Sequence, residues 1–259
     1  MSLFLAGLPL WVSGFLIVIL PTAVAMGGPL LVRRWVALER LTLNNEVAGF
    51  KFAVVGVIYA VLLAFAIIIA WQRFDDAETA VVREAGAAAT LYRLAAGPEP
   101  EAVETRRAIG RYLRLSIEKE WPRMAAESES REVTQALDAL YAAAVRFAQT
   151  GSRQTAVLLA IFGQLDTMTQ SRRHELELSF GIVPVMLWVI LLFGAVLTIA
   201  FTFFFGNANL RAQILMTGIL AAIVFMGLFV IVSVDHPFTG PVHIHSDPLQ
   251  AVLDDLDRG

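Results

Sequence analysis

The chain has 259 residues, of which 57% are hydrophobic and 17% are charged, and its mean hydropathy is +0.66. These values are too apolar for an ordinary soluble domain and too charged for membrane helix throughout, so we expect a membrane protein with a substantial polar part. The net charge of −3 offers no basic excess to neutralise phosphates, which excludes nucleic acid as a partner, and the absence of cysteine excludes disulfides and thiolate chemistry.

Four nearly uncharged stretches are long enough to cross a bilayer, which takes about 20 apolar residues. They lie at about residues 8–32, 50–71, 180–205 and 214–234. No basic leader precedes the first stretch, so we interpret it as a retained span. It contains Pro9, Pro21 and Pro29, which predict a bent or broken helix, and a peripheral helix that tolerates kinks is favoured over a hinge.

The short connections between spans are basic. The connection between the first two spans carries Arg33, Arg34, Arg40 and Lys51, and the one between the last two carries Arg211. Because short loops rich in Lys and Arg stay cytoplasmic, this pattern predicts that both termini lie outside the cell.

The region 72–179 is polar and shows the spacing of four amphipathic helices, which continue from the second span and into the third. Breaks are expected at 97–100, at Pro122, and at Gly151 and Ser152. Such helices cannot bury their apolar stripes alone, so they pack as a bundle or against other subunits. The predicted fold is an all-α membrane protein with four transmembrane helices and an extramembrane bundle between the second and third. The predicted regions are 1–71, 72–179, 180–234 and 235–259, the last being a turn and a short helix.

Two charged patterns in the bundle leave alternatives open. Glu118 and Glu120 beside Trp121 are either a solvated charge run next to a core aromatic residue, which is favoured, or a pair of ion-coordinating carboxylates. Four arginines recur at helical spacing and form either a solvated face paired to glutamates or an anion-attracting vestibule. They are Arg106, Arg107, Arg111 and Arg114.

Histidines gather after the fourth span, where His236, His243 and His245 stand close to Asp235 and Asp247. His243 and His245 are two apart on an extended segment and point the same way, so they could share a metal. A titratable tail without metal is favoured because no third ligand is indicated. We expect no cofactor.

The usual catalytic patterns are missing. The sequence has no glycine-rich phosphate loop, no nucleophile elbow and no HExxH motif. The spans contain no Asp, Glu, His, Arg or Lys except Lys51 at the start of the second, which weighs against a proton-coupled carrier. We therefore expect that this protein is not an enzyme.

The second span has two distinguishable faces. A small-residue stripe suited to close helix contact comprises Gly49, Ala53, Gly56, Ala60 and Ala64. The candidate pore-lining face comprises Phe52, Val55, Tyr59, Leu62, Ala66 and Ile69. The candidate pore mouth comprises Asn44, Asn45, Glu46 and Lys51. The alternatives are that both faces pack within one subunit and that the asparagines only cap the helix.

Several segments resemble a prokaryotic family of unknown function that is labelled bestrophin-like. They are NNEVAGF at 44–50, GVIYAVLLAF at 56–65, FDDAETAVVREA at 74–85, the segment 112–121 ending in KEW, and DHPFTG at 235–240. The resemblance implies a four-span protein that assembles as a ring, a pentamer, around a pore lined by the second span, as the bestrophin anion channels do. Bestrophins keep their helical part cytoplasmic, contrary to the charge pattern above. The acidic calcium clasp of bestrophins is also missing, with only Asp254, Asp255 and Asp257 nearby.

We expect a homo-oligomeric ion channel, anion-conducting by resemblance, whose second span forms a hydrophobic constriction. Its partners would be lipid, ions and its own copies, and its location the bacterial inner membrane as a multi-pass protein. The alternative is a membrane sensor or scaffold whose bundle binds a ligand or partner protein.

Overall fold

The computed structural model describes residues 7–43, 45–149, 155–181, 183–240 and 242–258, and within them every regular element is a helix. The all-α prediction is therefore confirmed. The chain divides into two compact units: unit 1 comprises Met1–Gln72 and Val183–Asp235, and unit 2 comprises Arg73–Ile182 and His236–Gly259. Asn44 and the expected break at Gly151 and Ser152 lie outside the described residues.

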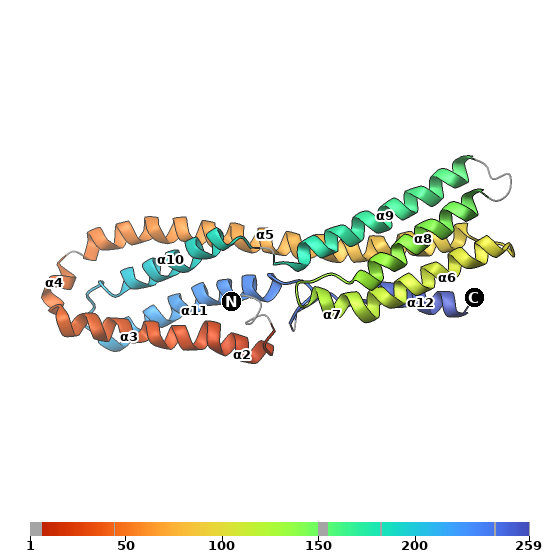
Figure 1. The fold of residues 1–259 in the computed structure, drawn as a ribbon. Coiled ribbons are helices and arrows are strands. Elements are labelled where there is room, and N and C mark those ends of the chain that lie inside the picture. The colour runs from red at the N-terminus through yellow and green to blue at the C-terminus, as the bar shows by residue number, and fades with distance from the viewer. Residues whose placement is uncertain (1–6, 44, 150–154, 182, 241, 259) are drawn as a thin grey trace. The chain divides into compact units, whose positions relative to one another are not determined.

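Unit 1 consists of the helices that Figure 1 labels α2, α3, α4, α10 and α11 together with the first part of α5. In chain order they are α2 (Leu10–Gly14), the π-helical turn η1 (Phe15–Ile19), α3 (Leu20–Trp35), α4 (Leu38–Thr42), the first part of α5 (Asn45–Leu94), α10 (Val185–Thr202) and α11 (Leu210–Val234). Four segments are long and apolar enough to cross a membrane. They are Leu10–Trp35, Asn45–Leu94, Val185–Thr202 and Leu210–Val234.

The third span begins later than the hydropathy pattern predicts. In unit 2, α9 (Thr155–Ser179) ends at Ser179, and Gly181 follows with φ of 85°, a left-handed conformation that favours glycine. In unit 1, Pro184 precedes the first helical residue, Val185, of α10. The expected continuous helix from the bundle into the third span is therefore wrong, because backbone geometry, not hydropathy, ends α9.

Each π-helical turn in the described residues ends two residues before a proline. Pro21 follows η1 in the first span, and Pro122 follows η2 (Ser116–Glu120), which leads into α7 (Trp121–Met124). Proline lacks the N–H that would bond the carbonyl four residues earlier, and a π turn accommodates that missing bond with an extra residue per turn. The predicted irregularity of the first span is thus a change of helix type at Pro21.

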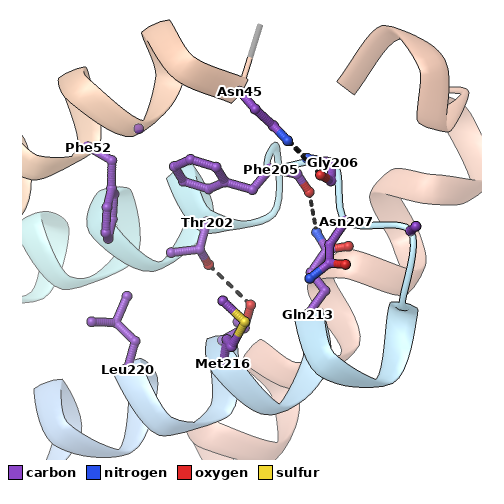
Figure 2. A pocket seen from close by; sticks show the side chains of 12 residues that line it. Asn45, Phe52, Thr202, Phe205, Gly206, Asn207, Gln213, Met216 and Leu220 are labelled. Carbon is purple, nitrogen blue, oxygen red and sulfur yellow. Dashed lines mark hydrogen bonds between the residues drawn. The ribbon is translucent and has the colours of Figure 1, made fainter. Parts of the chain in front are cut away.

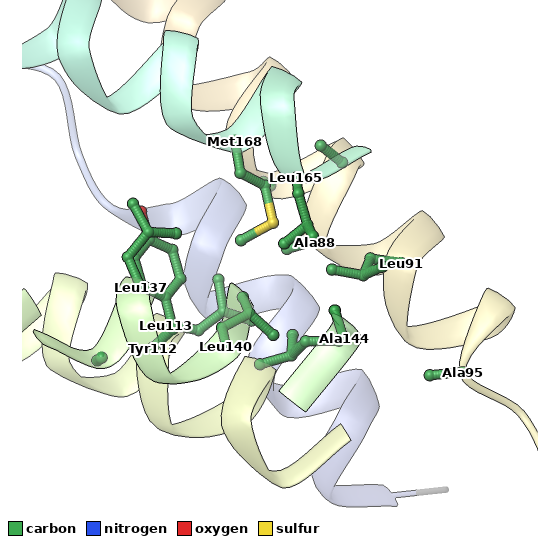
Figure 3. Packing of buried hydrophobic residues seen from close by; sticks show 14 of the residues in the cluster. Ala88, Leu91, Ala95, Tyr112, Leu113, Leu137, Leu140, Ala144, Leu165 and Met168 are labelled. Carbon is green, nitrogen blue, oxygen red and sulfur yellow. The ribbon is translucent and has the colours of Figure 1, made fainter. Parts of the chain in front are cut away.

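Unit 2 is a helical bundle with an apolar core. It contains the rest of α5, α6 (Pro100–Leu115), η2, α7, α8 (Arg131–Gln149), α9 and α12 (Asp247–Arg258). Figure 3 shows the core, whose largest fully buried members include Leu91, Tyr112, Leu140, Leu165 and Met168. Burying a side chain of this size stabilises the fold by about 1.5–3 kcal/mol. The stripes predicted at helical spacing therefore face inward as expected.

The C-terminal segment belongs to this bundle and does not stand apart. Leu249 and Leu253 of α12 are buried in the same cluster as residues of α6 and α8. Before α12, Phe238 packs edge-on against Trp121, with ring centroids 5.7 Å apart. The Nε1 of Trp121 donates a hydrogen bond to the carbonyl oxygen of Ile244 at 3.2 Å. The segment after the fourth span thus contributes directly to the core of unit 2.

Candidate functional site

The second span, the first part of α5, places the predicted pore-lining residues in different environments. In chain order they are Phe52 (half-buried), Val55 (half-buried), Tyr59 (5% exposed), Leu62 (41%), Ala66 (2%) and Ile69 (46%). The centre of this face therefore packs inside unit 1, and one edge of it is open.

The buried centre is fixed by close contacts with two other spans. The Tyr59 hydroxyl donates a hydrogen bond to the carbonyl oxygen of Leu191 on α10, at 3.1 Å. A Cβ at Gly194 would lie 2.7 Å from the Tyr59 ring, and a Cβ at Gly227 of α11 would lie 2.7 Å from Leu63 Cδ2. Glycine at these two positions lets α10 and α11 approach α5 closely, so this face is an internal packing surface.

The rest of the second span is an exposed apolar surface. Its large members are Phe50, Val54, Val57, Ile58, Val61, Phe65 and Ile68. Three residues of the small-residue stripe, Ala53, Ala60 and Ala64, are exposed as well. A single chain thus leaves most of this helix available for lipid or for another subunit.

At the predicted pore mouth, Asn45 joins the start of α5 to the loop between α10 and α11. Its Nδ2 donates to the carbonyl oxygen of Gly206 at 2.6 Å, and its Oδ1 accepts from the N–H of Gly206 at 2.9 Å. A Cβ at Gly206 would lie 2.5 Å from the backbone nitrogen of Thr42, so only glycine fits there. Glu46 and Lys51 are exposed on α5. Asn45 therefore holds the start of the second span in place, while the charges remain in contact with the surroundings.

A cavity of about 600 Å³ opens beside Asn45 (Figure 2). Phe52, Phe205 and Leu220 give it apolar walls, and amide groups line one end. There the Nε2 of Gln213 donates to the carbonyl oxygen of Phe205 at 2.6 Å, and Arg33 donates to the Oε1 of Gln213, also at 2.6 Å. Arg33, one of the basic residues in the connection after the first span, also donates to the carbonyl oxygen of Asn207, so it links the loop after α10 to α11.

In unit 2, Glu120 forms a buried ion pair with Arg172. The guanidinium donates two hydrogen bonds to the carboxylate, at 2.6 and 2.8 Å, and a third at 3.1 Å to the Thr134 hydroxyl. The backbone N–H of Ser130 donates to the same carboxylate at 3.1 Å. The solvated charge run favoured from the sequence is therefore wrong for Glu120, because this residue stands seven positions after the fully buried Leu113 and so falls on the same inward face of the helix, while Glu118 stays exposed.

Next to this pair lie two more buried carboxyl groups, Glu84 on α5 and Glu175 on α9, each 2% exposed and joined by a side-chain hydrogen bond. The Tyr112 hydroxyl donates to Glu84 Oε1 at 2.6 Å. Burial raises the pKa of both Glu84 and Glu175, and for Glu175 the charge of Glu84 raises the pKa further. Both shifts favour the protonated form, so the pair holds a proton to higher pH than exposed glutamates do.

This raised pKa predicts a pH-dependent stability. A carboxyl whose folded pKa exceeds its unfolded value stabilises the fold fully below the ordinary glutamate pKa of about 4.3, and that stability is lost as pH rises toward the folded pKa. We expect the free energy of unfolding to fall above pH about 5, by up to about 1.4 kcal/mol per pH unit for each proton retained. Glu175→Gln should flatten that slope in denaturant titrations across pH, whereas Glu132→Gln, on the exposed side of α8, should leave it unchanged. Identical slopes in all three proteins would contradict the assignment.

The sequence carries a signal for this buried polar cluster that the periodicity of the apolar residues alone does not reveal. Glu84 stands three residues after Val81 and four before Ala88, so it lies within the predicted apolar stripe. Arg172 and Glu175 follow Met168 by four and seven residues on the inward face of α9. A charge at an inward position of an amphipathic helix indicates a buried partner.

The two candidate metal-binding histidines do not converge on a shared point. The rings of His243 and His245 stack, with centroids 4.3 Å apart and planes 19° apart. The Nδ1 atoms lie next to backbone carbonyl oxygens, of Gly240 and of His243 respectively. Across the described residues, no group of three or more His, Cys, Asp or Glu side chains is placed to hold a metal ion.

The sequence model of the Bestrophin-like domain matches residues 19–249. Solved structures with the same fold include a bacterial bestrophin homologue from Klebsiella pneumoniae, with 15% identity and a TM-score of 0.69 over 93% of this chain and 96% of that one. Two mutant structures of a bacterial bestrophin homologue from that organism are similar. One has 14% identity and a TM-score of 0.71, covering 93% and 96% of the two chains. The other has 16% identity and a TM-score of 0.69, covering 94% and 93%. No curated protein matches the sequence.

Proposed function

Because this chain belongs to the bestrophin-like family and carries four helices able to cross a bilayer, we propose that it is a homo-oligomeric ion channel with a constriction formed by the second span. The relatives of similar fold are described as bestrophin homologues, and bestrophins are channels. Multi-pass insertion in a membrane follows from the family and the four apolar helices. The inner membrane, a pentameric ring and anion selectivity are the finer parts of the proposal.

One observation carries the proposal: an exposed strip runs the length of the second span. Lys51, Ile58, Leu62, Phe65 and Ile69 recur at intervals of three, four and seven residues and are all exposed on the single chain. At 100° per residue they fall within one narrow sector of the helix, beside the internal packing face. Facing a symmetry axis, such a strip would form a bulky apolar neck with a cation near one end.

Exposure also selects among the residues of the predicted pore face. A side chain that lines an axis shared by several subunits must be accessible on each of them, which Leu62 and Ile69 are. Tyr59 and Ala66 are buried against the subunit's own helices, so they pack behind the proposed pore lining and do not face the axis. Ile58 and Phe65 take their place in the proposed lining.

Recording from the purified protein in planar bilayers tests the proposal. We expect discrete conductance steps with a reversal potential that follows the chloride gradient if anions are conducted. A reversal potential that follows the cation gradient would support channel function and contradict anion selectivity. Silence under every ion gradient, pH and voltage, from protein that is monodisperse and folded, would reject channel function.

A second candidate function is a membrane sensor or scaffold. It is favoured by α5, which extends as one helix of 50 residues from the second span into the bundle, so a shift in the bundle could be transmitted along it. Absence of conductance together with a specific ligand of the bundle would favour this function.

A further inference from the structure

One face of α6 lines a strongly basic groove in unit 2. The groove has a volume of about 440 Å³, and Tyr92 of α5 and residues of α12 complete its walls. Its charged lining residues are Arg106, Arg107, Arg111, Arg114 and Asp257. Four guanidinium groups thus face a single carboxylate in a concave site, which is more positive than a solvated face balanced by glutamates would be.

Two of these arginines have protein partners that leave the groove open. The Nη1 of Arg106 donates to the carbonyl oxygens of Ala95 and Gly97, at 2.8 and 3.1 Å, and its guanidinium stands 5.9 Å from the centre of the Tyr92 ring. Arg106 is therefore a fixed cation in the wall. Arg114 lies 3.7 Å from Asp257, and both side chains are more than half exposed, so this pair is weak and readily exchanged for another anion.

Arg107 and Arg111 have no acidic partner in the part of the chain that the structure describes. They are exposed and four residues apart, hence neighbours on the helix surface, where like charges repel. Within the described part of unit 2, neither guanidinium has an ion pair that would offset this repulsion. A bound anion with two or more negative groups would offset the repulsion between Arg107 and Arg111, because guanidinium groups bind phosphate oxygens through paired hydrogen bonds.

A glycine, Gly110, lies between Arg107 and Arg111 on the same face of α6. It lines the groove in the middle of α6, and a Cβ built there meets no atom within 4 Å. Glycine in a helix costs about 0.5–1 kcal/mol relative to alanine, and neither packing nor backbone conformation requires it here. Its effect is to keep the floor of the groove low between Arg107 and Arg111.

We propose that this groove binds a small polyanion with two or more phosphate groups, either a free oligophosphate or the headgroup of a diphosphate lipid. A neighbouring hollow of about 750 Å³ shares Tyr92 and Arg106 and adds Arg93, which extends the basic surface for a ligand longer than one phosphate. The proposal concerns unit 2 alone and does not depend on ion conduction.

Isothermal titration calorimetry of the full-length protein in neutral detergent, with inorganic triphosphate as the ligand, tests whether the groove binds a free oligophosphate. Arg107→Gln together with Arg111→Gln should weaken binding by about tenfold or more for each guanidinium removed. Gly110→Leu should abolish binding by filling the groove while every arginine remains. In parallel, native mass spectrometry should show whether wild type retains added cardiolipin, which carries two phosphates, and whether the same variants lose it.

Matched controls separate the groove from general charge and from folding. Arg131→Gln with Arg173→Gln removes two exposed arginines of unit 2 outside the groove, and Gly163→Leu adds the same bulk at another open helical glycine. Both should bind as wild type does. Triphosphate binding that depends on Gly110 assigns a free oligophosphate, and cardiolipin retention alone assigns a lipid headgroup. Absence of both, or equal binding in groove and control variants, overturns the proposal.

Discussion

Replacing Leu62 and Ile69 together by alanine is expected to raise the single-channel conductance several-fold. Both side chains lie on the exposed strip of the second span, about two helical turns apart, and each change removes three carbons from the proposed neck. A hydrophobic constriction conducts poorly because water leaves it, so a wider neck holds water and admits ions more readily. Single-channel recording in planar bilayers measures the change directly.

The matched control lies on another side of the same helix. Val57 and Ile68 are 64% and 50% exposed and similarly apolar. They stand about 100–140° around the helix from Leu62 and Ile69. Their double alanine variant should conduct as wild type does. Equal currents in all three proteins would remove Leu62 and Ile69 from the pore, and a larger current only in the Val57 and Ile68 variant would place that other side of the helix at the axis.

Replacing Glu120 by glutamine is expected to destabilise the protein by about 3–5 kcal/mol, because it leaves Arg172 buried without its countercharge. The pair is held by two hydrogen bonds of 2.6 and 2.8 Å, and its side chains are only 9% and 3% exposed. Burial by itself would lower the pKa of Arg172, but its hydrogen bonds to Glu120 outweigh this and raise it, so the guanidinium stays charged. Denaturant unfolding of the solubilised protein, followed by circular dichroism, measures the loss.

Two further variants show whether the loss of stability comes from the burial of the Glu120–Arg172 pair or from the loss of any ion pair. Glu104→Gln breaks the pair with Arg146, which has the same shortest distance of 2.6 Å but side chains that are 54% and 50% exposed, and should cost at most about 1 kcal/mol. Replacing Glu120 and Arg172 together by methionine removes both buried charges and should recover most of the stability. If Glu120→Gln costs no more than Glu104→Gln, the buried pair is not a major stabilising element of unit 2.

The sequence predicts the location of the second span but not which of its side chains are buried. Leu62 and Tyr59 are both large residues on the predicted face of the second span, and nothing in their local sequence separates them. Only the contact of Tyr59 with α10, made possible by Gly194 more than a hundred residues later, shows that it points inward. Likewise the side chain of Asn45, expected to cap a helix or line a pore mouth, bonds the backbone of Gly206.

The sequence by itself determined the four spans, the helical bundle and its inward stripes, because hydropathy and helical periodicity are local properties that add along the chain. It also carried the motifs that resemble the family. Tertiary structure alone decided which edge of the second span stays open, that Glu120 meets Arg172 and Glu84 meets Glu175, and that α9 ends before the third span. Each of these depends on residues far apart in sequence or on a single backbone conformation, and a local pattern specifies neither the distant partner nor the turn that brings it close.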